Sequence, residues 1–258
     1  MISGDGKITL KNRKTHIRKT IRYQNADGTY SQQALREINR IFGVKDPDEK
    51  ISLRLVSLLD YLEDHSHAPR VEVISGYRDA TENQALKKQG RPAATTSLHL
   101  EGMAADITLG GMPLKELWNS LRDLECCGAG YYGTTLHVDT GPARFWEENT
   151  SGVEKDLGAK NRLIIARTDQ DIYFPGETME IQLARITDYP IGVIAPFDPQ
   201  QFCQLIRSRS ERRLAVTLPK EIAPTKKMIL KIRFCQKPFP EMPDTIELNP
   251  IQIQGESP

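Results

Sequence analysis

Residues 96–107, TSLHLEGMAADI, combine two kinds of residue that seldom serve one purpose. A buried strand has no use for His99 and Asp106, and a surface loop has no use for the apolar residues that follow Gly102. If both side chains bind one metal ion, each must bring an atom within about 2 Å of it. A straight chain from His99 to Asp106 would span about 10.5 Å as a helix and about 23 Å as a strand. The chain must therefore turn between them, and Gly102 predicts the turn.

A neighbouring strand is the expected source of a third ligand. In the stretch LHVDTG, residues 136–141, His137 and Asp139 alternate with apolar residues and therefore share one face of a strand. Two histidines and one carboxylate leave a fourth position open to water, which is the arrangement of catalytic zinc. On spacing alone, His99 and His137 are equally well explained as hydrogen-bonded histidines in unrelated places.

The first 160 residues mix helix and strand patterns. Their apolar periodicity and turn residues predict an α+β domain in which helices flank a small antiparallel sheet. The candidate ligands His99, Asp106 and His137 are expected to form a zinc cleft in this domain. Capping residues place the helix ends: Ser31 at one start, a capping box at Thr81 and Gln84, and Pro113 and Gly128 around another helix. The predicted elements are a strand pair over 8–24, helices over 31–42, 51–62, 81–89 and 113–127, a strand over 71–75 and a strand or hairpin over 130–141.

The character of the chain changes near residue 158. Short β-rich runs follow, punctuated by Pro and Gly at nearly regular spacing, and this pattern predicts an all-β sandwich of immunoglobulin-like type. Residues 153–161 are the expected linker. The predicted domains are 1–158, which carries the zinc cleft, and 159–258, whose role the sequence does not indicate.

Composition narrows the function classes. The 258 residues carry a formal net charge of +1, which predicts no general affinity for nucleic acid, and the chain has no apolar run of transmembrane length or signal-peptide type. Residues 201–238 hold ten Lys and Arg against two Asp and Glu, which suits either an anionic polymer or a solvated sheet face. Adjacent Cys126 and Cys127 are expected to be small buried residues, whereas Cys203 and Cys235 could pair in an oxidising compartment.

Three separated stretches carry a family resemblance. SGYRDATENQAL (75–86), SLHLEGMAADI (97–107) and GAGYYGTTLHVDTGPARFW (128–146), in this order, resemble the zinc D-alanyl-D-alanine carboxypeptidase superfamily, peptidase family M15. They are most similar to its exported branch of murein endopeptidases, often labelled by a domain of unknown function. The resemblance covers residues 20–150 and does not extend to 160–258.

The resemblance implies a set of site residues. Arg78 matches the arginine that faces the substrate, where its guanidinium fork suits a carboxylate or a carbonyl oxygen gaining charge. Tyr77 is expected beside it at the substrate, and Tyr77 and Ser97 are expected to brace the site through hydrogen bonds. The implied ligands of one Zn²⁺ ion are His99, Asp106 and His137.

The general base is left open. Many superfamily members carry an acidic residue three positions before the last zinc histidine, but this chain has Thr134 there, which cannot take the proton. Asp139 lies on the same strand face as His137, so it is either the base or a partner that holds a ligand or Arg78 in place. Glu101, expected in the turn and facing solvent, is the next candidate.

The resemblance implies a zinc metallopeptidase that hydrolyses peptide bonds in peptidoglycan stem or cross-link peptides. One alternative is a non-catalytic, zinc-containing cell-wall binding module of the same fold, which Thr134 favours. The other is a carboxypeptidase that trims terminal D-alanine. The family implies a periplasmic or cell-envelope location, and the β-domain is expected to bind an envelope protein or polymer.

Overall fold

The chain forms two units, which are described separately. The computed structural model describes residues 3–88, 97–148, 164–184, 190–208, 210–237 and 242–255. The first unit is Ile2–Gly158, and the second is formed by Ala159–Pro258. The expected linker, residues 153–161, lies outside the described residues.

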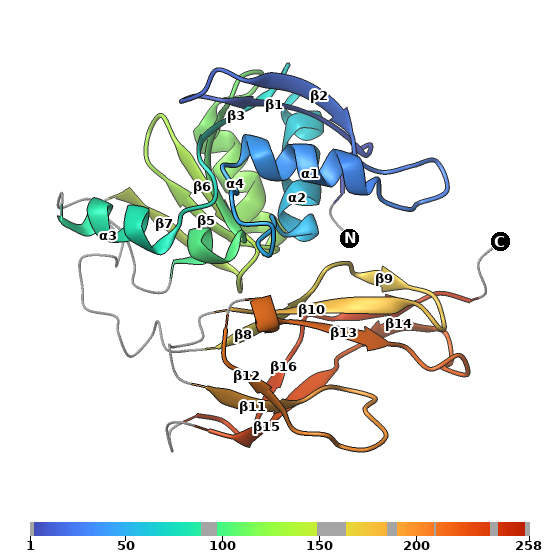
Figure 1. Ribbon diagram of the computed structural model, residues 1–258. Helices are drawn as coiled ribbons and strands as arrows, with labels where there is room; N and C mark the ends of the chain where they lie inside the picture. The colour runs from blue at the N-terminus through green and yellow to red at the C-terminus, as the bar shows by residue number, and fades with distance from the viewer. Residues whose placement is uncertain are drawn as a thin grey trace. The chain divides into compact units, whose positions relative to one another are not determined.

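The first unit is built on a seven-stranded sheet (Figure 1). The strands lie in the order β2-β1-β3-β4-β6-β5-β7. The bounds are β1 Lys7–Asn12, β2 Arg18–Arg22, β3 Val71–Ser75, β4 Ala104–Leu109, β5 Gly128–Tyr131, β6 Leu136–Asp139 and β7 Arg144–Glu147.

The α+β class predicted from the sequence is confirmed, but the sheet is larger and more mixed than expected. β1 pairs with β3 in parallel, and β5 pairs with β7 in parallel, while the other four pairings are antiparallel. A parallel neighbour requires a crossover connection, and between β1 and β3 the chain forms β2 and two helices. Alternation within single strands does not reveal such crossovers, so the sequence indicated only the local hairpins.

Three helices pack against the sheet. α1 (Gln32–Ile41) contacts β1 and β2, α2 (Leu53–Ser66) contacts β1 and β4, and α4 (Leu114–Leu124) contacts β5 (Figure 1). Their apolar stripes meet every second residue of the strands in one hydrophobic core. The core includes Ile8, Leu10, Ile38, Leu55, Leu59, Val71, Val73, Ala105, Ile107, Leu117, Leu121, Leu136 and Val138. Alternate positions on the strands therefore face away from this core.

Helix ends agree with the capping expectations at one place and differ at two. Ser31 accepts the backbone N–H of Ala34 and begins α1 as predicted. α3 (Ala80–Lys88) begins earlier than expected, because the reciprocal hydrogen bonds of a capping box join Asp79 and Glu82 rather than Thr81 and Gln84.

α4 ends before the predicted glycine. Its C-cap is Glu125, with a left-handed backbone at φ 48°, so Gly128 is free to begin β5. Leu124, the last residue of α4, is 44% exposed. The expected burial of adjacent cysteines holds for Cys127 alone, since Cys126 is exposed.

The second unit is all-β in its described part, apart from the short 3₁₀ turn Ser210–Arg212. Its strands form three sheets, in the orders β13-β10-β8, β12-β11-β15-β16 and β14-β17-β9. The bounds are β8 Ile165–Thr168, β9 Ile172–Tyr173, β10 Thr178–Ala184, β11 Ile191–Ile194, β12 Gln204–Ile206, β13 Arg213–Thr217, β14 Thr225–Met228, β15 Lys231–Gln236, β16 Thr245–Glu247 and β17 Ile251–Ile253.

The three sheets share one hydrophobic core, to which strands of each sheet contribute. Cys203 and Cys235 form a disulfide, with their Cα atoms 6.0 Å apart. Gly192 lies beside it, and a Cβ there would come within 2.9 Å of both sulfur atoms. The disulfide that the sequence left open is therefore present, and it requires a residue without a side chain at Gly192 of β11.

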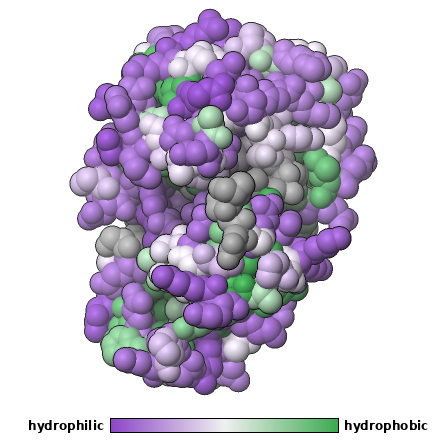
Figure 2. All heavy atoms as spheres, turned by 90° about the vertical axis from the view of Figure 1, so that its right-hand side faces the viewer, coloured by the Kyte–Doolittle hydropathy of each residue, from purple (hydrophilic) through white to green (hydrophobic). Residues whose placement is uncertain are grey.

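The described helices include none that is both long and apolar enough to cross a lipid bilayer. On the face drawn in Figure 2, hydrophilic residues predominate and hydrophobic residues form small patches. The negative mean hydropathy of −0.48 accords with this surface.

Candidate metal centre

The turn that brings His99 to Asp106 is built by its flanking residues. His99 lies in a short 3₁₀ helix, Leu98–Glu101, whose N-cap Ser97 accepts the backbone N–H of His99. Gly102 ends this helix with φ 64°, and a Cβ there would collide with the backbone oxygen of Lys50. The turn predicted at Gly102 is confirmed, and only glycine fits it.

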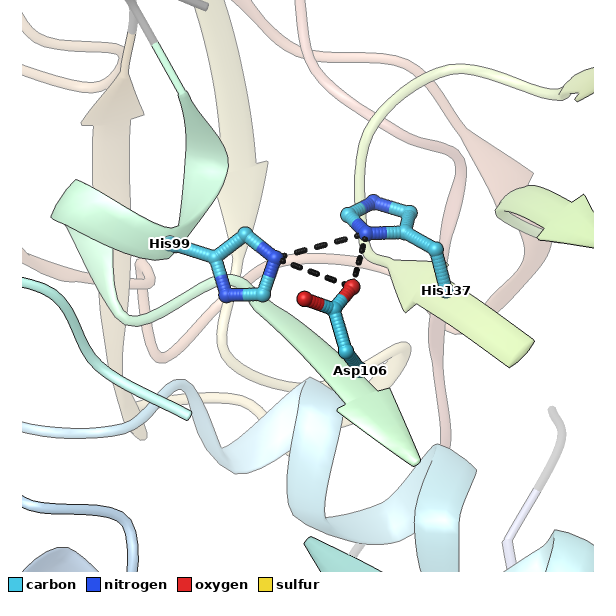
Figure 3. A group of neighbouring side chains, drawn as sticks. All are labelled: His99, Asp106 and His137. Carbon is cyan, nitrogen blue, oxygen red and sulfur yellow. Dashed lines mark hydrogen bonds and ion pairs between the residues drawn. The ribbon is translucent and has the colours of Figure 1, made fainter. Parts of the chain in front are cut away.

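Strand pairing brings the other two side chains together. Asp106 on β4 lies directly opposite His137 on β6 in the antiparallel register. Both alternate with core residues, so they project from the sheet face opposite the helical core. The three polar residues predicted from the sequence therefore lie in one cluster, to which the 3₁₀ helix contributes His99 (Figure 3).

The three nearest atoms form a compact triangle. His99 Nε2 is 3.3 Å from His137 Nδ1 and 3.3 Å from Asp106 Oδ1, and the last two atoms are 2.9 Å apart (Figure 3). Ligands at zinc distances of 2.0–2.1 Å in tetrahedral geometry are about 3.3 Å from one another. The triangle is thus close to one face of a zinc coordination tetrahedron.

Hydrogen bonds behind the triangle orient the two imidazole rings. His99 Nδ1 is 2.8 Å from the backbone oxygen of Gly76, which can only accept, so Nδ1 carries a proton and Nε2 presents a lone pair. His137 Nε2 is 3.0 Å from Asp139 Oδ2, so that nitrogen donates and Nδ1 faces the triangle. Donation from the far nitrogen to an oxygen is the usual arrangement of a metal-binding histidine.

The charges of the cluster favour a cation at its centre. Burial lowers the pKa of His99 and keeps this ring neutral. Burial opposes charge on His137 as well, but hydrogen bonds to Asp106 and Asp139 raise its pKa to about 9. Despite its burial, the neighbouring histidines hold the pKa of Asp106 well below the usual range. Without a metal, a proton on His137 Nδ1 supplies the positive charge, and zinc can replace this proton.

Asp139 is held on every side. Its side chain is fully buried, Oδ1 accepts from the backbone N–H of Gly141 at 2.8 Å, and Arg144 donates to both carboxylate oxygens at 3.0 and 2.6 Å. Although burial opposes ionisation, Arg144 and His137 hold the pKa of Asp139 below its usual value. A Cβ at Gly128 would lie 2.5 Å from Asp139 Oδ2, so this glycine makes room for the pair.

Arg78 reaches the cluster from the segment after β3. Nη2 donates to Asp106 Oδ2 at 2.5 Å, and Nε donates to Ser75 Oγ at 2.8 Å. The guanidinium therefore holds the carboxylate oxygen that does not face the histidines. Within the part of the chain that the structure describes, no hydrogen bond or ion pair reaches Nη1, which leaves one end of the fork for another group.

Trp146 forms an aromatic wall beside His137. The two ring centroids are 5.3 Å apart, and Trp146 Nε1 donates to the hydroxyl of Tyr132 at 2.7 Å. On β5, Gly130 pairs with His137 on one side and with Trp146 on the other, and a Cβ at Gly130 would come within 2.5 Å of the indole nitrogen. Trp146 and Arg144 were not predicted as site residues, although glycines at alternate positions of β5 signal large side chains on the neighbouring strands.

The other predicted residues lie around the cluster. Tyr77 is partly buried and packs against the hydrophobic core, and its backbone N–H donates to the oxygen of Phe42. Glu101 is only 7% exposed, so the expectation that it faces solvent is wrong. Thr134 is exposed in the turn between β5 and β6.

Comparison with known proteins gives matches for the first unit. Residues 3–146 match the family Peptidase_M15_2, described as peptidoglycan L,D-endopeptidase MepK. Over 148 residues the chain is 32% identical to the peptidoglycan L,D-endopeptidase MepK of Escherichia coli strain K12, which is 54% of this chain and 79% of that protein.

A second relative is the probable peptidoglycan L,D-endopeptidase MepK of Haemophilus influenzae. It is 43% identical over 79 residues, which are 30% of this chain and 42% of the relative, so this match spans less than half of that protein. No solved structure matches the chain significantly.

Proposed function

Because the chain belongs to the Peptidase_M15_2 family, described as peptidoglycan L,D-endopeptidase MepK, we propose that it is a zinc-dependent endopeptidase acting on peptidoglycan peptides. The bond that it hydrolyses joins an L- to a D-configured residue, as the names of its relatives indicate. One observation carries the proposal: the donor atoms of His99, Asp106 and His137 lie within 3.3 Å of one another at zinc-like spacing.

The donor set fits zinc in number and kind. Two imidazole nitrogens and one carboxylate oxygen are ligands that zinc prefers, and three protein ligands leave one position for water or substrate. A zinc ion held here would supply a Lewis acid and an activated water for peptide hydrolysis. We assign His99, Asp106 and His137 as its ligands.

The surrounding residues hold the ligands in place. The oxygen of Gly76 fixes the tautomer of His99, and Asp139 fixes that of His137. Arg144 and Gly141 in turn fix Asp139 through three hydrogen bonds. The Asp139 carboxylate is fully buried, and the hydrogen bonds from His137, Gly141 and Arg144 stabilise its ionised form. This geometry supports the role of positioning residue over that of general base. Glu101 then becomes the leading candidate for the base.

Arg78 and Trp146 are assigned to the substrate side. The end of the Arg78 fork that no described residue contacts can donate to a carboxylate or to the carbonyl oxygen that gains charge. The partly exposed indole of Trp146 beside His137 offers an apolar surface for the peptide. Tyr77 is proposed to support Arg78 rather than to contact the substrate, since its ring packs on the core.

The proposed location is the periplasm or cell envelope, where the substrate lies. The Cys203–Cys235 disulfide supports an oxidising compartment. Catalysis is assigned to residues 1–158, and the β-unit 159–258 is proposed to be an immunoglobulin-like module that docks on an envelope polymer or protein. Its excess of Lys and Arg over residues 201–238 supports an anionic polymer.

Incubation of the zinc-loaded protein with purified muropeptides, followed by mass spectrometry, tests the function. We expect products cut within a peptide at an L,D-bond, with an inactive His99→Ala variant as the control. Release of terminal D-alanine alone would identify a carboxypeptidase. Intact muropeptides after incubation with the zinc-loaded chain would instead support a non-catalytic binding module.

A further inference from the structure

The first unit has a second cluster of acidic side chains, formed by Asp5, Asp60 and Asp64. Asp60 and Asp64 are one turn apart on the same face of α2, and Asp5, in the segment before β1, contacts this helix through Asp64. One carboxylate oxygen from each residue lies within 4.8 Å of the others. None of the three belongs to the His99 centre.

Asp60 has a buried oxygen that lacks a partner. Its side chain is 0% exposed, and Oδ2 accepts from the Gly6 backbone N–H and from the Tyr23 hydroxyl, both at 2.9 Å. Oδ1 is buried and has no hydrogen-bond partner among the described residues. A buried carboxylate oxygen without a donor costs free energy, so a ligand that satisfies it would stabilise the fold.

The backbone at Gly4 packs directly against this carboxylate. A Cβ at Gly4 would lie 2.5 Å from Asp60 Oδ1, so only glycine allows the backbone to pass so close. The backbone N–H of Asp5 donates to Asp64 Oδ2 at 2.9 Å, which brings the three acidic residues together.

Among the described residues, the positively charged side chains that contact the cluster do so at Asp5, where Arg22 Nη1 donates to the backbone oxygen at 3.3 Å. Lys7 Nζ lies 3.9 Å from Asp5 Oδ2, and both side chains are about half exposed, so this ion pair compensates little. Burial, with smaller contributions from Asp64 and Asp5, raises the pKa of Asp60 to about 6.

We propose that Asp5, Asp60 and Asp64 bind a hard divalent cation, with calcium as the best fit. The donors are all carboxylate oxygens, and ligands at calcium distances of 2.3–2.6 Å lie up to about 5 Å apart, as the oxygens here do. The exposed Asp5 and Asp64 leave room for the waters that complete its coordination. The ion would satisfy Asp60 and tie the beginning of the chain to α2.

Calcium binding to the zinc-loaded full chain tests the site. With calcium-free buffer and one fixed zinc concentration, calorimetric titration should show one calcium per chain, with a Kd on the order of 10⁻⁴ to 10⁻³ M. Thermal unfolding should shift upward by about 3–10 °C near 10 mM calcium. Asp64→Asn should weaken binding at least about tenfold and remove most of this shift.

Matched variants separate the site from general ion effects. Asp123→Asn, whose side chain is 77% exposed on α4, should respond to calcium as the parent does. Asp60→Asn is the most severe change, but if it fails to fold, Asp5→Asn and Asp64→Asn still decide the matter. The proposal is overturned if the parent shows neither binding heat nor a thermal shift, or if Asp64→Asn responds as strongly as the parent.

Discussion

Among its described residues, the first unit has two clusters that could hold a metal, and they differ in donor chemistry and in the residues that support the donors. In the His99 cluster, the polar atom of each side chain that does not face the triangle has a hydrogen-bond partner: Gly76 for His99, Asp139 for His137 and Arg78 for Asp106. In the Asp60 cluster the donors are all oxygens, and two of the three residues are exposed. Rigid support and mixed donors suit zinc, whereas exposed carboxylates suit a hydrated cation such as calcium.

The difference in support between the two clusters favours the proposal that the His99 cluster is the catalytic one. Activation of water requires a fixed metal with one open position, and fixed ligands require neighbours that constrain their orientation. The His99 cluster has these neighbours, with Arg78 and Trp146 beside it. The Asp60 cluster has a single buried carboxylate and no histidine, so a structural role follows from its composition.

The largest expected effect is that of His99→Ala. Loss of a ligand should reduce zinc content from about one per chain to near zero, and activity should fall by more than the 10–100-fold typical of an outer partner. Elemental analysis and muropeptide assays measure both. Calcium binding should be unchanged, and parent-like zinc in the variant would remove this cluster from consideration.

Arg78→Ala should have the next largest effect. It removes a donor aimed at developing charge, so turnover should fall by about 10²–10³-fold. It also frees Asp106 Oδ2, so zinc affinity should fall moderately. Assays at saturating zinc separate the two roles: if added zinc fully restores turnover, Arg78 only positions Asp106. Arg78→Lys should recover little, because an ammonium group does not reproduce the fork.

Asp139→Asn tests the support behind His137. If Asp139 is a positioning residue, zinc affinity should fall by roughly 10–100-fold, and excess zinc should restore most activity. If it is the base, zinc affinity should stay near the parent value while turnover falls by about 10²–10⁴-fold. A zinc titration monitored by activity distinguishes these outcomes, and parent-like behaviour in both would exclude both roles.

The smallest expected effect is the change of zinc affinity with pH, which accumulates over each pH unit. Because the pKa of His137 is raised to about 9, its proton competes with zinc below that pH. Zinc affinity should therefore rise about tenfold per pH unit from neutral pH toward 9 and then level off. Titration against a chelator of known affinity measures this slope. A flat profile from pH 7 to 9 would show that no such proton is displaced.

Local features were predictable because they depend on short stretches. The Gly102 turn, the Ser31 cap and the shared strand face of His137 and Asp139 follow from residue type and alternation. The positions of Arg144 and Trp146 depend on the parallel pairing of β5 with β7, which no local pattern encodes. The Asp60 cluster joins the beginning of the chain to a helix more than 50 residues away, so it also required the tertiary structure.

His99, Asp106 and His137 are proposed to hold one zinc ion. Anomalous scattering at the zinc absorption edge from crystals of the zinc-loaded protein tests it directly. We expect one peak within about 2.0–2.2 Å of His99 Nε2, His137 Nδ1 and Asp106 Oδ1. The absence of a peak there, or a peak on His137 Nε2 with Asp139 turned toward it, would exclude this set of ligand atoms.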